Sequence, residues 1–337
     1  MANIKMTDVA AAAGVSIATV GRVLHKNGYV SEEARVKVEK AVAELGYVPN
    51  RMARALKQQK SGVIGSLVVF DRNTLYQKIN SSIIAAAEQH GFKLLTIEGR
   101  PDVREEEELV DQFIGMQVEG LVVTSNRFVP PLLFDRLHRL NIPVVMVERT
   151  FEHRYVDNLA VRDVYGAYQP VSDMARKGHK RIGLIAVERD DNVEKQRFEG
   201  YLKALAEAGI QRDDRLIHLY PQYTLEYGYD AMEKLLKLPE PPTAVFCTAD
   251  TLAAGAMQLL HRRNWHVPQD MSIAGYDNVL AMELSPPINS VDLALQDIGE
   301  TVLRLLKRRI EDPEAEPVTE SIDTIYVDRG TVIRPDK

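Results

Sequence analysis

The 337-residue sequence contains a single cysteine, Cys247, and a single tryptophan. One cysteine cannot form an intramolecular disulfide, which excludes a disulfide-stabilised secreted scaffold and fits a reducing compartment. No apolar run reaches the roughly 18 residues that a membrane-spanning helix needs. The N-terminal segment also lacks the apolar core and cleavage region of a secretory signal. We therefore expect a cytoplasmic protein with no membrane partner.

Sequence motifs of catalysis and metal binding are missing as well. The eight histidines show no HExxH motif or other paired metal-ligand spacing, and there is no P-loop, G-x-G-x-x-G or G-x-S-x-G motif. Cys247 lies in the apolar run TAVFCT, which favours a small core residue over a nucleophile. The sequence therefore predicts no catalytic residues, no metal and no cofactor, and a protein that is not an enzyme.

Length and charge both divide the chain. At about 100–200 residues per domain, the length predicts two or three domains. Residues 1–60 hold 10 Lys and Arg against 5 Asp and Glu, whereas residues 61–337 hold 32 basic and 43 acidic side chains. The net charge of −6 thus combines a segment of +5 with one of −11. A basic segment beside an acidic one indicates a nucleic-acid or membrane role for the basic one.

Three short helices are expected in the basic segment. Thr7 and Ser16 stand where they would cap two helices joined by a turn at Gly14, and Ser31 would cap a third. Two short helices joined by a glycine turn form a helix-turn-helix. The alternative is an alanine-rich helical hairpin that serves as an interaction module, and the glycine turn alone does not separate the two.

The second helix would carry the contacts to DNA bases. Its first residues are Ile17 and Ala18, at the position from which a recognition helix reaches base edges in the major groove. Apolar side chains there contact thymine methyl groups, and Arg22, one turn later, is placed to pair with guanine. The predicted phosphate contacts are Thr19, Lys26, Asn27 and Lys37.

Three linked motifs, DVA…AGVS…TV…RVL, VS…R.KV and ELGY.PN..AR.L, run through this segment. They resemble the DNA-binding head and hinge of the lactose-repressor/galactose-repressor (LacI/GalR) family, and the resemblance extends through nearly all of the remaining chain. It implies a hinge from Asn50 to about Lys60 that becomes a helix on operator DNA. There Leu56 would wedge into a minor-groove base step, at a cost of a few kcal/mol that is recovered through contacts on the bent DNA. Without the resemblance, Leu56 is an apolar residue in a flexible linker.

Gly21 departs from the family pattern, which usually has Ser inside the recognition helix. Glycine there costs about 1 kcal/mol of helix stability relative to Ala and removes a possible phosphate contact. We expect a lower operator affinity or a larger dependence on the hinge. The full set of expected DNA contacts is Thr7, Ser16, Ile17, Ala18, Thr19, Arg22, Asn27, Asn50, Ala53 and Leu56.

From Gly62 onward, short apolar runs alternate with longer amphipathic segments, and the pattern restarts after Asp163. Strands without strict polar alternation, separated by helices, indicate parallel sheets covered on both faces. The core is thus predicted to be α/β, with two doubly wound parallel-sheet lobes that resemble a periplasmic binding protein. The expected divisions are 1–48 for the helix-turn-helix domain, 49–60 for the hinge, 61–161 plus about 292–321 for the N-terminal lobe, and 162–291 plus about 322–337 for the C-terminal lobe.

Ligands of open α/β sheets bind beyond the carboxyl ends of the strands, so two facing lobes predict a site in the cleft between them. The residues expected at strand ends could equally be helix caps or turn formers. They are Phe70, Asp71, Asn73, Tyr76, Thr124, Ser125, Asn126, Glu148, Arg149, Arg197, Asp250, Tyr276 and Asp277.

The family resemblance sharpens several of these positions. RFEGYLKAL matches the segment whose arginine binds effector, which implies that role for Arg197, and IAGYDN implies it for Asp277. Asp250 is retained from a segment usually written Asn-Asp, and Glu148 is a longer carboxylate where the family usually has Asp.

Arg162 and Asp163 stand where many family members have Asp-Asn. A cation beside Arg197 would suit a carboxylated or phosphorylated sugar better than a neutral one. The alternative is that Arg162 pairs with a carboxylate on the lobe surface. The expected effector-binding set is Phe70, Asp71, Tyr76, Ser125, Glu148, Arg162, Arg197, Asp250 and Asp277.

These features together predict a transcription regulator, and specifically a repressor of a carbohydrate-utilisation operon. It would bind a pseudo-palindromic operator in double-stranded DNA as a homodimer, under the control of a small sugar-type effector. The rival from another class is a sugar-binding transport receptor without DNA binding, because the two-lobed core resembles such receptors. A two-domain α/β enzyme is the third possibility and lacks any motif.

Overall fold

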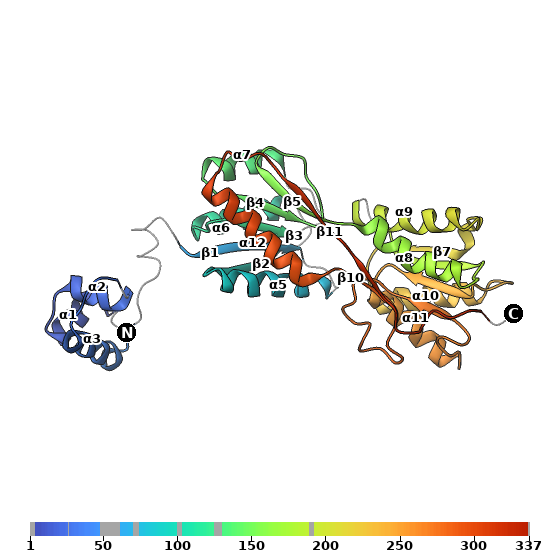
Figure 1. The fold of residues 1–337 in the computed structure, drawn as a ribbon, viewed down its shortest axis with the longest axis horizontal. Helices are drawn as coiled ribbons and strands as arrows, with labels where there is room; N and C mark the ends of the chain where they lie inside the picture. The colour runs from blue at the N-terminus through green and yellow to red at the C-terminus, as the bar shows by residue number, and fades with distance from the viewer. Residues whose placement is uncertain are drawn as a thin grey trace. The chain divides into compact units, whose positions relative to one another are not determined.

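The computed structural model divides the chain into two compact units, Met1–Ser61 and Gly62–Lys337 (Figure 1). The structure describes residues 4–25, 27–47, 61–69, 74–99, 103–124, 130–188 and 192–335.

The first unit is a three-helix head made of α1 (Met6–Ala13), α2 (Ile17–His25) and α3 (Glu32–Leu45). Gly14 and Gly46 adopt the left-handed conformation, at φ 66° and 62°, and end α1 and α3. The core of the head consists of Val9, Ala10, Ala13, Val20, Val38, Ala41 and Tyr47. The prediction of an all-α helix-turn-helix head is confirmed.

The helix caps match the sequence prediction at two of three positions. The Ser16 hydroxyl accepts the Thr19 amide at 3.1 Å, and the Ser31 hydroxyl accepts the Ala34 amide at 3.4 Å. The cap predicted at Thr7 is wrong, because α1 begins at Met6 and Thr7 lies within its first turn. The Asp8 carboxylate accepts the Lys5 amide at 2.7 Å instead, so the helix starts earlier.

The first lobe of the second unit is built on a six-stranded sheet of order β11-β5-β4-β3-β1-β2, in which all paired strands are parallel. Its strands are β1 (Val63–Val69), β2 (Lys93–Gly99), β3 (Leu121–Thr124), β4 (Val144–Val147), β5 (Val156–Val161) and β11 (Thr319–Ile322). Its helices are α5 (Leu75–Gln89), α6 (Val103–Gly115), α7 (Pro131–Arg139) and α12 (Leu295–Glu311). Helices α5 and α12 pack on one face of the sheet, and α6 and α7 on the other.

The second lobe has a four-stranded parallel sheet of order β7-β6-β8-β9. Its strands are β6 (Ile182–Val187), β7 (Ile217–Tyr220), β8 (Ala244–Cys247) and β9 (Ser272–Ala274). Its helices are α8 (Asp163–Arg176), α9 (Asn192–Glu207), α10 (Leu225–Leu236) and α11 (Asp250–Arg262), with a short 3₁₀ helix at Asp214–Leu216. Buried side chains of α8 and α9 cover one sheet face and those of α10 and α11 the other. The predicted pair of doubly wound parallel lobes is confirmed.

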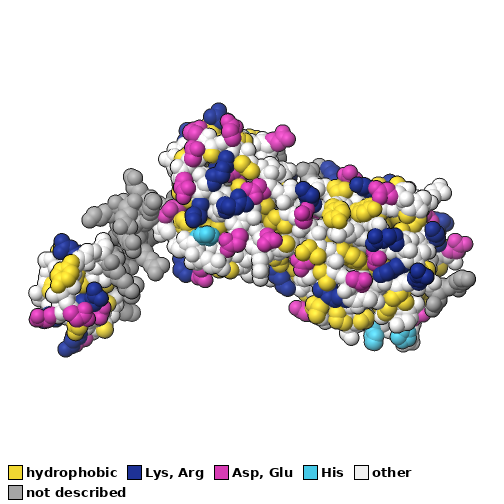
Figure 2. Space-filling view, viewed as in Figure 1, with side chains coloured by type: hydrophobic (Ala, Val, Ile, Leu, Met, Phe, Trp, Pro, Cys, Tyr) yellow, Lys and Arg dark blue, Asp and Glu magenta, His cyan; other side chains and the backbone are white. Residues whose placement is uncertain are grey.

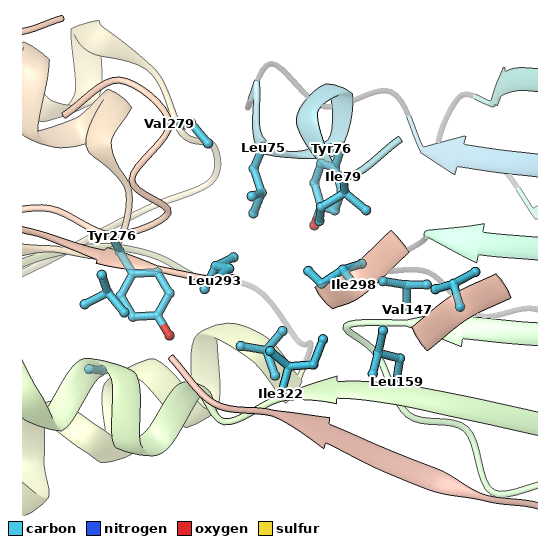
Figure 3. Packing of buried hydrophobic residues seen from close by; sticks show 14 of the residues in the cluster. Leu75, Tyr76, Ile79, Val147, Leu159, Tyr276, Val279, Leu293, Ile298 and Ile322 are labelled. Carbon is cyan, nitrogen blue, oxygen red and sulfur yellow. The ribbon is translucent and has the colours of Figure 1, made fainter. Parts of the chain in front are cut away.

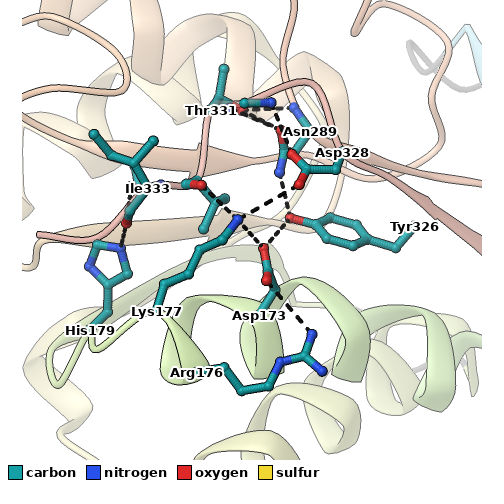
Figure 4. A network of polar contacts seen from close by, with 12 residues as sticks. Asp173, Arg176, Lys177, His179, Asn289, Tyr326, Asp328, Thr331 and Ile333 are labelled. Atoms are coloured by element: carbon teal, nitrogen blue, oxygen red, sulfur yellow. Dashed lines mark hydrogen bonds and ion pairs between the residues drawn. The ribbon is translucent and has the colours of Figure 1, made fainter.

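A short antiparallel ribbon of β10 (Ser290–Asp292) and β12 (Ile325–Val327) accompanies the chain where it passes between the lobes. Polar contacts tie this ribbon to α8 (Figure 4). The Tyr326 hydroxyl accepts a hydrogen bond from the Asn289 amide at 2.7 Å and donates one to Asp173 at 3.3 Å. Lys177 bridges Asp173 and the Val332 carbonyl, at 2.8 Å each, so the C-terminal segment is attached to the same helix.

Surface charge and helix composition complete the description. On the face shown in Figure 2, basic and acidic side chains are interspersed over the second unit, so the acidic balance of this unit does not form one acidic patch there.

Within the described ranges, no single helix has the length and apolarity to cross a membrane. Only Met6–Ala13 and Ile17–Leu24 taken together meet that criterion, as a pair bent by 103°.

Candidate functional site

The exposed start of α2 is the first candidate surface. Ile17 is 50% exposed although it is apolar, and Ser16 and Ala18 beside it are also exposed. Val20, on the opposite side of the helix, is fully buried in the head core. The helix therefore presents Ile17 and Ala18 outward, as a helix that reads base edges requires.

The turn that follows α2 adds a residue that sequence reasoning missed. Tyr29 is 91% exposed, which is unusual for a large aromatic side chain. Arg22 packs along the same turn, because a Cβ at Gly28 would lie 3.5 Å from its Cδ. No local sequence pattern singles out Tyr29, and only its exposure beside α2 does so.

The other predicted DNA contacts differ in how they are placed. Thr7, Thr19 and Asn27 lie in or next to the first two helices, whereas the Lys37 ammonium on α3 is 2.7 Å from Glu33. Lys37 is therefore already paired within its own helix. The predicted contacts Lys26, Asn50, Ala53 and Leu56 lie outside the described residues.

Arg197, on α9, is the centre of the second candidate site. Its side chain is only 2% exposed, and a buried charge requires partners. Nε donates to the Asp163 carboxylate at 2.9 Å, and one terminal nitrogen donates to the Thr248 carbonyl at 2.8 Å. Burial alone would lower the pKa of Arg197, but Asp163 and Asp277 outweigh it and raise that pKa well above its usual value. Arg197 is thus a permanently charged guanidinium that Asp163 and the Thr248 carbonyl hold in place.

Asp277 approaches the same guanidinium, with its Oδ1 3.4 Å from a terminal nitrogen of Arg197. The backbone there is left-handed at both Asp277 (φ 89°) and Asn278 (φ 52°). Non-glycine residues in this conformation are strained, and such strain concentrates at functional sites. The predicted pair Arg197 and Asp277 is therefore brought together by the fold.

Glu148 belongs to the first lobe and interacts electrostatically with Arg197, Asp163 and Asp277. We call these charged side chains the cluster. It follows β4, is buried, and is also left-handed at φ 67°. Burial raises the pKa of Glu148 to about 8, with Asp163 and Asp277 adding to the increase. The charge of Arg197 and a hydrogen bond from Tyr76 of α5 oppose it. Residues of both lobes thus form one electrostatically coupled cluster near the strand ends.

Glu194 is a member of the cluster that sequence reasoning missed. It lies one helical turn before Arg197, and its Oε1 is 3.6 Å from the guanidinium. Its carboxylate accepts hydrogen bonds from Tyr223 at 2.5 Å and from Thr248 at 3.0 Å. The spacing of three residues on α9 was the available signal, because it places Glu194 and Arg197 on the same helix face.

Asp250 supports the site through the loop that follows Asp277. Its carboxylate accepts the amides of Leu280 and Ala281, at 3.0 and 3.1 Å, and the Ser290 hydroxyl at 2.6 Å. Gly275 is required for this approach, because a Cβ there would come 2.3 Å from Oδ1 of Asp250. Asp250 is therefore the turn former that the sequence offered as the alternative, and it holds the loop that follows Asp277.

Arg162 also follows the alternative prediction, in which it pairs with a carboxylate on the lobe surface. Its guanidinium lies 3.1 Å from Asp323, and both side chains are more than half exposed. Asp163, its neighbour in the chain, is the residue that contacts Arg197. Arg162 therefore balances a surface carboxylate rather than adding a second cation to the buried cluster.

The remaining strand-end candidates are only partly described. Thr124 ends β3, and its buried hydroxyl has no hydrogen-bond partner among the described residues. Cys247 is fully buried in the core of the second lobe, and burial raises the pKa of its thiol. No group of three or more His, Cys, Asp and Glu in the described ranges could hold a metal ion. Phe70, Asp71, Asn73, Ser125 and Asn126 lie outside the described residues.

Known protein families match parts of both compact units. Residues 5–50 match the family model described as bacterial regulatory proteins, lacI family, and residues 171–332 match a periplasmic binding protein-like domain. The chain is 32% identical over 327 residues to the HTH-type transcriptional repressor CytR of Escherichia coli (strain K12), which covers 97% of this chain and 95% of that protein. It is 30% identical over 332 residues to the ribose operon repressor of Haemophilus influenzae, with coverage of 98% and 97%.

Among solved structures, the Lac repressor bound to ONPG in its repressed state superposes with a TM-score of 0.84 at 25% identity, covering 98% of this chain and all of that one. All three relatives are named as repressors, and the similarity extends over at least 95% of each of them. None of the three is named as an enzyme or a transport receptor. The transport-receptor alternative is therefore rejected in favour of a DNA-binding transcription regulator. With its helix-turn-helix head, its two-lobed core and this full-length similarity, the chain belongs to the lacI family of bacterial regulatory proteins.

Proposed function

We propose that the protein represses a carbohydrate-utilisation operon, and that a small sugar-type effector bound between the lobes controls its affinity for operator DNA. The observation that carries the proposal is the buried ionic cluster to which both lobes contribute. Glu148 comes from the first lobe, and Arg197 and Asp277 come from the second. A ligand that engages this cluster contacts both lobes at once, so its binding energy depends on how the lobes are placed.

The chemistry of the cluster favours a neutral, polyhydroxylated effector. Its described members offer one guanidinium and four carboxyl groups, Glu148, Asp163, Glu194 and Asp277. Carboxylates accept hydrogen bonds, a protonated carboxyl group such as that of Glu148 also donates one, and sugar hydroxyls both donate and accept them. Arg197 is already engaged by Asp163 and Thr248, and Arg162 by Asp323. No unpaired cation in the described cluster is therefore left for a carboxylated or phosphorylated sugar. The hydroxyl of Thr124, which has no hydrogen-bond partner among the described residues, supplies a further polar group at a strand end.

The head supplies the contacts to DNA in this proposal. Ile17 and Ala18 read base edges, Thr7, Ser16, Thr19 and Asn27 contact the backbone, and Arg22 pairs with guanine. Asn50, Ala53 and Leu56 act from the hinge, with Leu56 as the wedge. Two such heads on a homodimer fit a pseudo-palindromic operator, with one head in each half-site. The name of the ribose operon repressor, a relative of similar length, agrees with an operon-level role.

The proposed division of the chain follows from these roles. Residues 1–48 form the DNA-binding domain and 49–60 the hinge, while 61–161 with about 292–321 and 162–291 with about 322–337 form the two lobes. Effector binding shifts the population between two relative arrangements of the lobes and so decides whether both hinges fold on DNA. We further propose that the protein acts in the cytoplasm and has no catalytic activity of its own.

A gel-shift assay tests this proposal. The full chain is mixed with DNA that flanks its own gene, and neutral sugars, their acid forms and their phosphate esters are added in turn. We expect a retarded complex that one neutral sugar changes and that its charged derivatives leave unchanged. Absence of any complex would contradict the DNA-binding role, and a response to the charged derivatives alone would contradict the proposed effector class.

A further inference from the structure

The N-terminal end of α5 contacts a loop of the other lobe. The Lys78 ammonium donates a hydrogen bond to the Val279 carbonyl at 2.9 Å, across 201 residues of chain. Beside this bond, Val279 is only 3% exposed and belongs to the same buried cluster as Leu75 and Tyr76. Figure 3 shows Val279 facing the end of α5 that carries these two side chains. The contact therefore combines a charged hydrogen bond with apolar packing.

The loop that Lys78 contacts is the one that follows Asp277. On the side of the second lobe it is held by Asp250, through the amides of Leu280 and Ala281. The Asn278 side chain adds a bond to Asp292 at 2.6 Å. These bonds fix the loop to its own lobe. The bond from Lys78 connects the loop to the other lobe.

We propose that Lys78 is a positioning residue that couples closure of the lobes to the placement of Asp277 beside Arg197. This inference rests on the proposed function, because it assigns Lys78 to the regulation of the same site. When the lobes separate, the bond breaks and both of its groups return to water. A hydrogen bond with a charged donor favours the closed arrangement, and the exposure of the Lys78 stem keeps the effect moderate.

The test measures lobe separation directly in the full chain. Spin labels are placed at Glu108→Cys on α6 and Arg263→Cys at the end of α11, two exposed positions on different lobes. Cys247 is fully buried, so we expect the spin label to leave it unmodified. Double electron–electron resonance then gives the distribution of distances between the labels. Lys78→Met keeps the length of the stem and removes the ammonium, whereas Lys78→Arg keeps a charged donor.

We expect the parent chain to show mainly the short distance of the described structure. In Lys78→Met the population of short distances relative to that of longer distances should fall about tenfold. Lys78→Arg should restore most of the short-distance population. Lys93→Met, which removes an exposed ammonium paired with Glu88, serves as the matched control and should match the parent. Melting temperatures should stay within about 2 °C in all variants.

A distance distribution in Lys78→Met equal to that of the parent would overturn the proposal, and so would failure of Lys78→Arg to restore it. The measurement needs neither DNA nor metabolite. Its failure would therefore leave the proposed function untouched, and a failed gel shift would leave the lobe contact standing.

Discussion

The ring of Tyr276 covers one face of the Arg197 guanidinium, with Cζ 4.0 Å from the ring centroid. The Tyr276 hydroxyl donates at 2.8 Å to the same Asp163 oxygen that accepts from Arg197 Nε. The three side chains therefore form a closed triangle, in which each fixes the orientation of the other two. A planar guanidinium is suited to this arrangement because it stacks and donates at the same time.

Arg197→Lys should weaken effector binding without changing operator affinity in the absence of effector. Lysine keeps the charge but cannot stack on Tyr276 while it donates to both Asp163 and Thr248. Loss of a buried, hydrogen-bonded charge contact predicts at least about a 30-fold lower effector affinity. Calorimetric titration with the metabolite found by gel shift measures it. Arg212→Lys, at an exposed arginine paired with Asp214, is the control, and equal losses in both variants would argue against a specific role for Arg197.

Glu148→Gln should remove a pH dependence of stability. Burial raises the pKa of Glu148 from an ordinary 4.5 to about 8, so the folded state favours the protonated acid. The stability contributed by that preference is complete below about pH 4.5 and is lost as the pH rises through about 8. Because one pKa unit corresponds to about 1.4 kcal/mol, the variant should be more stable than the parent by a few kcal/mol at about pH 8.5.

Urea denaturation between about pH 5 and pH 8.5 checks this expectation. The stability difference between Glu148→Gln and the parent should be small at the acid end and grow with pH. Glu226→Gln, at an exposed position in the first turn of α10, should show no such growth. A constant difference across the range would mean that Glu148 does not titrate there.

Asp157→Ala should destabilise the first lobe far more than Asp323→Ala. Asp157 is fully buried and accepts from Arg309 at 2.9 Å, from Arg308 at 3.3 Å and from the Val318 amide at 2.9 Å. Its removal leaves buried Arg309 without its carboxylate, at a cost of about 3–5 kcal/mol. The exposed pair of Asp323 and Arg162 contributes about 0–1 kcal/mol. Similar unfolding midpoints in urea for the two variants would refute the contrast.

Gly21→Ser should raise operator affinity. A Cβ at Gly21 meets only the Met6 Cε, at the ordinary contact distance of 3.5 Å, so the head has room for the side chain. Serine gains about 0.5 kcal/mol of helix propensity and offers a hydroxyl to a phosphate, which together predict about a twofold to tenfold gain. Ala12→Ser, at an exposed position on α1, is the control for the gel shift. Unchanged or weaker binding by Gly21→Ser would contradict the expectation.

The parts of the fold set by local patterns were predictable. Continuous apolar runs such as VIGSLVV and IGLIAV form β1 and β6, and Gly14 ends the first helix through its own backbone freedom. The cap at Thr7 was not, because the Asp8 carboxylate accepts the Lys5 amide and the helix starts at Met6, before Thr7. Local sequence rules identify the residues that could cap a helix. Which of them does so depends on the hydrogen bond that forms at the start of the helix.

The site was predictable only where a motif carried it. Arg197 and Asp277 followed from the family resemblance, and the structure places them 3.4 Å apart. The contacts of Asp250 depend on amides some 30 residues further along the chain, and the partner of Arg162 is 161 residues away. Contacts at such separations follow from the topology rather than from any spacing in the sequence. Which of two stated alternatives holds is therefore decided by the fold.

The most direct test compares the full chain with residues 62–337, the second compact unit. Fluorescence anisotropy with DNA flanking the gene measures operator binding, and calorimetry with the metabolite found by gel shift measures effector binding. If the head binds DNA and the lobes bind effector, the shortened chain loses operator binding and keeps its affinity for the metabolite. Loss of both activities, or operator binding retained by residues 62–337, would contradict the account.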